Sequence, residues 1–227
     1  MAVAFDAQSS SAEGTGTLTW THTPVGTPRA VLITCVQNGG TGNEFLLATY
    51  GLSSVAEVAL SPAYSSAGDE DGGVAAYFLG TGIDTGAQTG AVTVTGTAAK
   101  IANVITLTAA ADTEVEDTEA FTSASQDEPT MDLVTGAGIE TYCAGALFSA
   151  LGTVGNVTAG ADYTKHASND FGTRTAHFQR LTANKTGGTY AFNWTTTAAD
   201  DVAMIAVAIK EAGAVAAQLP YLVTARR

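Results

Sequence analysis

The chain has 227 residues, of which 45% are hydrophobic and only 14% are charged, and its formal net charge is −13. Such a length allows a large core to form without disulfide staples. The negative charge opposes binding to nucleic acid phosphates and to anionic membrane surfaces, so we expect neither as a partner. The charge is unevenly spread, because residues 1–140 carry two bases and 17 acids while residues 141–227 carry seven bases and five acids.

The N-terminal sequence MAVAFDAQSSS lacks the basic segment and the long apolar core of a signal peptide. No stretch reaches the roughly 18 uninterrupted apolar residues that a membrane-spanning helix requires. We therefore expect synthesis in the cytoplasm without a secretion step.

Alternation with a period of two residues dominates the chain and predicts β-strands. The segment TGTLTWTH, for example, places Leu18, Trp20 and His22 on one face and threonines on the other. Fully apolar runs such as RAVLITCV and TYCAGALFSA are typical of strands buried on both faces. Turn clusters rich in glycine separate about a dozen such segments. The pattern predicts an all-β chain with a single β-sandwich over residues 1–213, jelly-roll-like or immunoglobulin-like, followed by a short C-terminal extension.

Two segments are less plain. The acidic stretch AADTEVEDTEAFTSASQDEPT is interpreted as a strand, EAFTSA, between two loops. The stretch DDVAMIAVAIKEAG permits a helix that begins at Asp201 and ends at Gly213. It also permits a strand with Ile205, Val207 and Ile209 on one side, and three β-branched residues at a strict period of two favour the strand.

No catalytic motif is present, and we expect no enzyme activity. The three histidines are His22, His166 and His177, and the chain has no G-x-S-x-G elbow that would hold a nucleophile. His22 and His177 lie in strand-like segments and are interpreted as structural. Cys35 and Cys143 lie in apolar runs, and we expect two buried, reduced thiols.

The sequence also predicts no metal and no cofactor. The acidic segment GDEDGG, residues 68–73, lacks the ligand spacing of a calcium loop and is interpreted as a solvated turn. The glycine clusters do not end in Lys-Ser or Lys-Thr as a phosphate-binding loop does, so we interpret them as turns.

The last residues form an unusual apolar tail. We predict that residues 214–227 are a docking arm that binds a neighbouring subunit, because apolar side chains would be buried there and the terminal arginines would meet acidic groups. The alternative is an arm that packs on its own sandwich or frays. The predicted docking residues are Leu219, Pro220, Tyr221, Leu222, Val223, Arg226 and Arg227.

Several of these segments, taken together, resemble a diffuse family of β-sandwich proteins encoded in tailed bacteriophage genomes. Two features depart from the family pattern: a single Gly51 stands where a glycine pair follows the tyrosine, and the tail beyond Gly213 is extra. The resemblance covers about residues 2–212 and supplies no catalytic residues. Its matching positions are Trp20, Val31 to Val36, Thr49 to Gly51, Tyr77 to Leu79, Val92 to Thr95, and Val207 to Lys210.

The resemblance implies a structural protein of the virion, and we expect a capsid decoration or minor head protein that contacts capsid proteins. Long all-β chains often cover their sheet edges with copies of themselves, so we also expect a homo-oligomer, with a trimer as the first expectation. Two alternatives stay open: a tail- or fibre-associated module, and a carbohydrate-binding sandwich. The second would need an exposed aromatic platform, for which Trp20 and Trp194 are the candidates.

Overall fold

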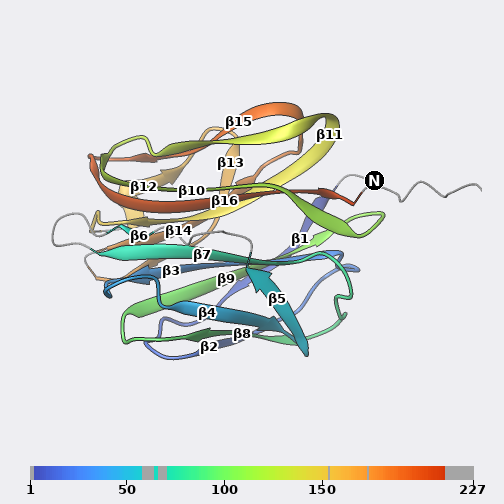
Figure 1. The fold of residues 1–227 in the computed structure, drawn as a ribbon, viewed down its shortest axis with the longest axis horizontal. Helices are drawn as coiled ribbons and strands as arrows, with labels where there is room; N and C mark the ends of the chain where they lie inside the picture. Colours follow the sequence, from blue (N-terminus) through green and yellow to red (C-terminus); the bar gives the residue numbers. More distant parts are fainter. Residues whose placement is uncertain (1–2, 58–63, 66–70, 153, 173, 213–227) are drawn as a thin grey trace, which may run out of the picture.

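The computed structural model describes residues 3–57, 64–65, 71–152, 154–172 and 174–212. Among these residues the chain forms 16 strands and one 3-10 turn, Val154–Asn156 (Figure 1). The strands are β1 (Ala4–Ser10), β2 (Leu18–His22), β3 (Ala30–Asn38), β4 (Phe45–Tyr50), β5 (Ser53–Glu57), β6 (Tyr64–Ser65), β7 (Gly72–Leu79), β8 (Gln88–Val94), β9 (Ala99–Thr108), β10 (Thr113–Gln126), β11 (Thr130–Ser149), β12 (Val157–Ala159), β13 (Tyr163–Asp170), β14 (Thr175–Leu181), β15 (Lys185–Thr196) and β16 (Asp200–Glu211).

The first half of the chain forms a jelly roll. Its sheet has the order β1-β9-β3-β7-β5-β4-β8-β2, with every pairing antiparallel. The sheet folds over at β5, so that β1, β9, β3 and β7 form one layer and β2, β8, β4 and β5 form the other (Figure 1). This order of strands in two facing layers is that of a jelly roll.

The second half repeats the same order. One layer reads β10-β16-β11-β14-β13, and β15 lies between the first part of β11 and β12 in the other layer. The 20-residue strand β11 bends between the two layers and so replaces both β2 and β3. The pairs that correspond are β1 and β10, β9 and β16, β7 and β14, β8 and β15, and β4 and β12. The described chain is therefore a tandem of two jelly rolls.

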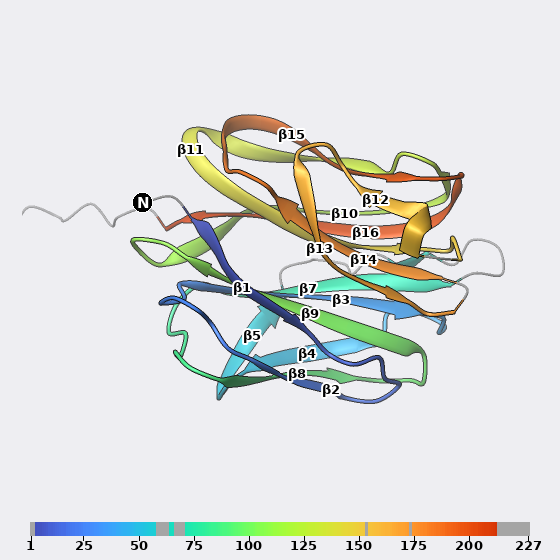
Figure 2. The ribbon, with the colours of Figure 1, turned by 180° about the vertical axis from the view of Figure 1, so that it is seen from behind.

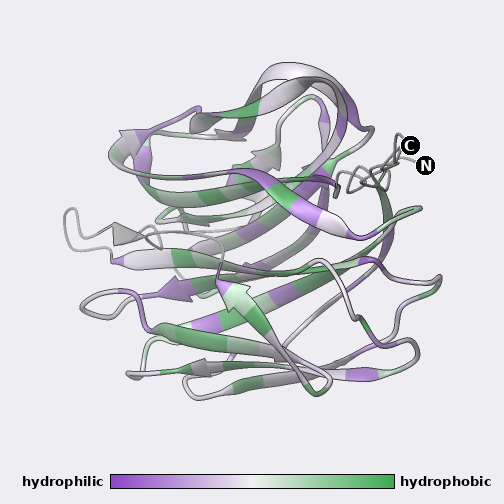
Figure 3. Ribbon diagram, turned by 45° about the vertical axis from the view of Figure 1, so that its right-hand side comes forward, coloured by the Kyte–Doolittle hydropathy of each residue, from purple (hydrophilic) through white to green (hydrophobic). Residues whose placement is uncertain are grey.

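Three apolar cores bury the hydrophobic side chains of the strands. One lies inside the first jelly roll and includes Leu18, Trp20 and Ile33, and another lies inside the second and includes Leu133, Phe192 and Trp194. The largest lies between the two jelly rolls, where the β9-β3-β7 layer packs on the β16-β11-β14 layer. Figure 3 shows that the hydrophobic segments concentrate in these central strands. Strands buried on both faces, such as β3, serve two cores at once.

Close contact between the jelly rolls requires glycine at one position. A Cβ atom on Gly72 would lie 2.3 Å from the ring of Phe148, which is fully buried in the shared core. No real Cβ atom approaches a ring so closely, so only glycine lets β7 lie against β11 at this point.

The all-β, sandwich-like fold predicted from the sequence is confirmed, and of the two arrangements left open the strand order is that of the jelly roll. The presence of two jelly rolls in place of a single sandwich was not predicted. The segment from Asp200 to Glu211 is a strand, as expected, and the acidic segment forms a longer strand than expected, because β10 extends through its acidic flank. Cys35 and Cys143 are buried and unpaired, each inside its own jelly roll.

Candidate interaction site

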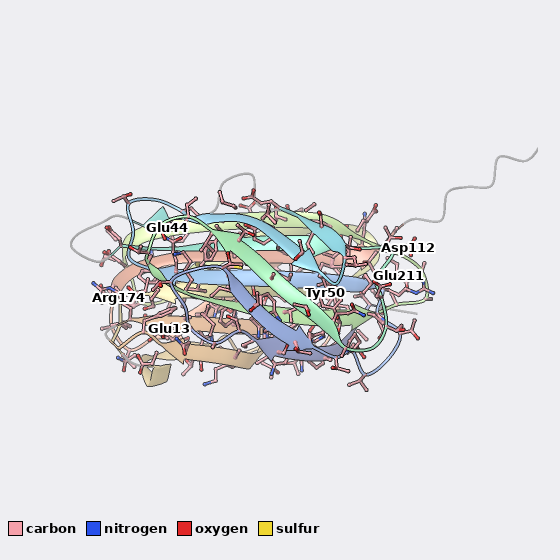
Figure 4. All side chains as sticks on the ribbon, turned by 90° about the horizontal axis from the view of Figure 1, so that it is seen from below. Glu13, Glu44, Tyr50, Asp112, Arg174 and Glu211 are labelled. Carbon is pink, nitrogen blue, oxygen red and sulfur yellow. The ribbon has the colours of Figure 1, made fainter. Side chains whose placement is uncertain are left out.

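All seven predicted docking residues, from Leu219 to Arg227, lie outside the described residues, so their position stays a prediction. The described chain ends at Ala212, whose N–H donates to the carbonyl oxygen of Asp112 at 2.8 Å. Glu211 accepts a hydrogen bond from the N–H of Ala110, also at 2.8 Å. Asp112 and Glu211 lie together at one end of the molecule, opposite Glu44 and Arg174 (Figure 4).

This end of the molecule is also where β15 begins. In the ladder, Lys185 at the start of β15 pairs with Thr141, and Ile209 near the end of β16 pairs with Tyr142, the next residue of β11. From this point β15 runs into the molecule while β16 runs out of it. The described chain therefore ends at the end of the molecule where β15 begins, with β11 between β16 and β15.

One side of β15 is largely uncovered. In the first jelly roll, β4 covers the corresponding strand β8 from Gly90 to Val94. In the second, β12 pairs only with residues 194–196 of β15, and β13 pairs with β14 instead. Figure 2 shows β13 crossing away from β15 toward β14. Among the described residues, no strand lies beside residues 189–193 of β15 on the side away from β11, which we call the open edge.

The open edge borders a groove of about 330 Å³. The carboxylate of Asp162 pairs with the ammonium of Lys185 at 2.5 Å at one side of this groove. The hydroxyl of Tyr163 donates to the carbonyl oxygen of Ala191 at 2.9 Å. Burial raises the pKa of Tyr163, so this hydroxyl stays a donor at neutral pH. The groove is lined by Ala161, Asp162, Tyr163, Lys185, Thr189, Tyr190, Ala191 and Asn193.

At every second residue of the open edge, the backbone N–H and C=O groups point into the groove. The carbonyl oxygen of Asn193 accepts from the N–H of Gly160 at 3.2 Å and from the side chain of Gln179 at 2.8 Å. The alternation of an antiparallel strand then directs the N–H groups of Ala191 and Thr189 to the same side. The Tyr190 hydroxyl is buried and has no hydrogen-bond partner in the described part of the chain. The groove thus offers backbone groups to an extended segment.

A second polar arrangement contains the residue types of a hydrolase site. Ser9 Oγ lies 2.9 Å from His22 Nδ1, and His22 Nε2 lies 3.1 Å from Thr106 Oγ1. Thr106 donates to Asp6 at 2.9 Å, so its hydroxyl oxygen accepts from Nε2–H, and Nδ1 accepts from Ser9. However, His22 is only 1% exposed, and its ring lies against Tyr50, 5.9 Å between centroids. Burial lowers the pKa of His22, although Asp6 opposes the shift.

We interpret these hydrogen bonds as structural, because they hold neighbouring strands together. They join β1, β2 and β9 where the two edges of the first sheet meet, and the imidazole lies buried against Tyr50. The other strand histidine, His177, is also fully buried and accepts a hydrogen bond from Trp194 Nε1 at 2.9 Å. Both rings are buried, and His177 Nε2 has no hydrogen-bond partner in the described part of the chain.

Carboxylates of β10 serve a structural purpose that the sequence did not reveal. Asp117 accepts from the N–H of Val134 at 2.6 Å, and Glu116 accepts from the N–H of Gly136 and the hydroxyl of Thr141. These bonds satisfy polar groups where β11 bends between the layers and its register shifts. The acidic run is therefore partly a support for this bend, and only a contact between segments distant in sequence reveals it.

Comparison with known proteins adds no relative. No protein-family model matches the chain, and neither the curated proteins nor the solved structures searched contain a match. Within the described residues, no helix is long and apolar enough to cross a membrane. The same residues contain no group of three or more histidine, cysteine or acidic side chains that could hold a metal ion.

Proposed function

We propose that this chain is a non-enzymatic structural protein of a tailed-phage particle, placed on the head as a capsid decoration or minor capsid protein. The observation that supports the proposal most is the tandem of jelly rolls with a shared core. The jelly roll is a recurring architecture of viral capsid domains. It is also found in lectins, so the fold alone does not choose between the two classes.

The sugar-binding alternative loses its candidate platform in this structure. Trp20 is 8% exposed and Trp194 is fully buried, and both belong to the cores of their jelly rolls. Neither indole can stack on a sugar without unfolding of the sheet. The buried positions of these rings therefore favour the structural proposal over a carbohydrate-binding module.

The charge of the molecule fits an assembly role. A net charge of −13 keeps separate copies apart in solution, because like charges repel. Assembly then requires a contact that offsets this repulsion. The segment from 214 to 227 contains two arginines, no acidic residue and a run of apolar side chains, which makes it the natural docking arm of such a protein.

The test is the protein composition of purified particles. We expect the chain to be present in many copies per particle by quantitative mass spectrometry, with its density on the outer surface of the head by cryo-electron microscopy. Density on the tail would contradict the placement on the head. Absence from purified particles would contradict the virion role altogether.

A further inference from the structure

The two jelly rolls provide an internal comparison, because the same strand is covered in one and open in the other. In the first, β4 pairs with β8 over residues 90–94, which completes the outer layer. In the second, three-residue β12 covers only the end of β15, and the groove of about 330 Å³ lies where the rest of such a strand would fit. Within the residues that the structure describes, the second jelly roll therefore lacks most of one strand.

We propose that the open edge of β15 receives residues 219–223 of a second copy of this chain as an added antiparallel strand. This inference deepens the docking role proposed above and rests on it. Addition of an extended segment to a free sheet edge gains main-chain hydrogen bonds, and the adjacent groove accepts alternate side chains. Here the N–H groups of Thr189 and Ala191 are the available donors.

The composition of the segment matches its receptor. Leu219, Tyr221 and Val223 would alternate with Pro220 and Leu222 along an extended chain. The receptor layer exposes Asp132 and Glu140 on β11 and Asp162 at the groove, whereas the arm carries only positive charge. Attraction between Arg226 or Arg227 and these carboxylates favours a docked arm.

The geometry favours a second copy over the same copy. The described chain ends at the end of the molecule where β15 begins but on the other side of β11, so its own arm would have to cross both β11 and β15 to reach the open edge. Only six residues separate Ala212 from Leu219, and from this end of the molecule its own arm would enter parallel to β15, which is the less stable pairing. An arm from another copy can enter in the antiparallel direction, as β4 does on β8.

The experiment compares full-length variants by light scattering over a range of concentrations and by NMR amide exchange. Ala191→Pro removes one N–H from the open edge, and proline is tolerated at such an edge because no ladder bond is lost. Ala191→Thr is the matched control, since it keeps the N–H. On the arm, Leu222→Asp is compared with Gln218→Asp, which adds the same charge outside the apolar run.

We expect the unaltered chain and both controls to associate and to protect the amides of Thr189 and Ala191 from exchange. Ala191→Pro and Leu222→Asp should shift association to at least tenfold higher concentration, and Leu222→Asp should remove the protection. Equal association of all variants would overturn the proposal. Protection in a protein that stays monomeric would also overturn it, since the arm would then occupy its own edge. Both readouts use the isolated protein, so their failure is distinguishable from absence of the protein from the virion.

Discussion

His166 Nε2 lies 2.8 Å from Asn103 Oδ1, and this hydrogen bond joins the two jelly rolls across their shared interface. The amide nitrogen of Asn103 donates to Gln8, Ser9 and Ser10, so its oxygen must be the acceptor and His166 must carry the proton on Nε2. Burial lowers the pKa of His166 to about 3, and the nearby Arg180 and His177 contribute. The imidazole is therefore neutral in the folded protein.

We predict that stability falls as the pH drops below about 6.5, the pKa of an unfolded histidine. In this window the unfolded chain binds protons at His166 and His177 that the folded chain does not bind, because burial lowers the pKa of His177 to about 4. Each histidine should remove about 1.4 kcal/mol of unfolding free energy per pH unit until the pH reaches its folded pKa. Urea unfolding between pH 7 and pH 4.5 measures this slope.

The variant His166→Gln provides the control for this prediction. Glutamine can still donate to Asn103, but it cannot take up a proton. We expect the slope below pH 6.5 to decrease by about one proton relative to the unaltered chain. An unchanged slope would mean that His166 does not contribute to the pH dependence of the unfolding free energy.

The contact between Gly72 and Phe148 gives a prediction with an internal control. Phe148→Ala should lower the unfolding free energy by about 3–5 kcal/mol, because it leaves a cavity in the shared core. Gly72→Ala should cost about 1–3 kcal/mol by overpacking against the ring. In the Phe148→Ala background, where the ring is gone, Gly72→Ala should cost much less. Additive losses in the double variant would contradict the contact.

The same core predicts that the two jelly rolls unfold together. Twenty buried residues form the cluster between them, and both halves contribute to it. We therefore expect one transition in calorimetry and coincident transitions by tryptophan fluorescence and far-ultraviolet circular dichroism. A stable, folded half after cleavage between β9 and β10 would show two domains instead of the single domain predicted for residues 1–213.

Both cysteines should be unreactive in the native protein. Burial raises the pKa of Cys143 to about 12 and raises that of Cys35 as well, and neither side chain is exposed. We expect thiol reagents to label them only at the rate of unfolding. Replacement of either by serine should cost about 1–3 kcal/mol, because it buries a hydroxyl group. Labelling within seconds under native conditions would contradict their burial.

Local patterns in the sequence predicted the strands well, because their alternation reports directly on which side chains face a core. Leu18, Trp20 and His22 are buried in alternation with exposed threonines, as expected. The presence of two jelly rolls was not predictable in this way, since β11 replaces two strands without a turn and β3 is apolar on both faces for two different cores. Recognition of the repeat requires the pairing of strands far apart in sequence.

The candidate site was predictable only in part. The tail from Leu219 to Arg227 is unusual in composition, and this signal is present in the sequence. Its proposed receptor has no comparable signal, because the open edge of β15 results from the shortness of β12 and from the pairing of β13 with β14. The sequence VTA of β12 contains nothing that limits the strand to three residues.

The proposed function is assembly on a particle through the C-terminal arm. The most direct measurement is the affinity for particles stripped of the protein, compared between the full-length chain and a variant that lacks residues 214–227, with circular dichroism to verify that the variant is folded. We predict that the folded variant loses at least tenfold in affinity. Binding with unchanged affinity would contradict the proposal.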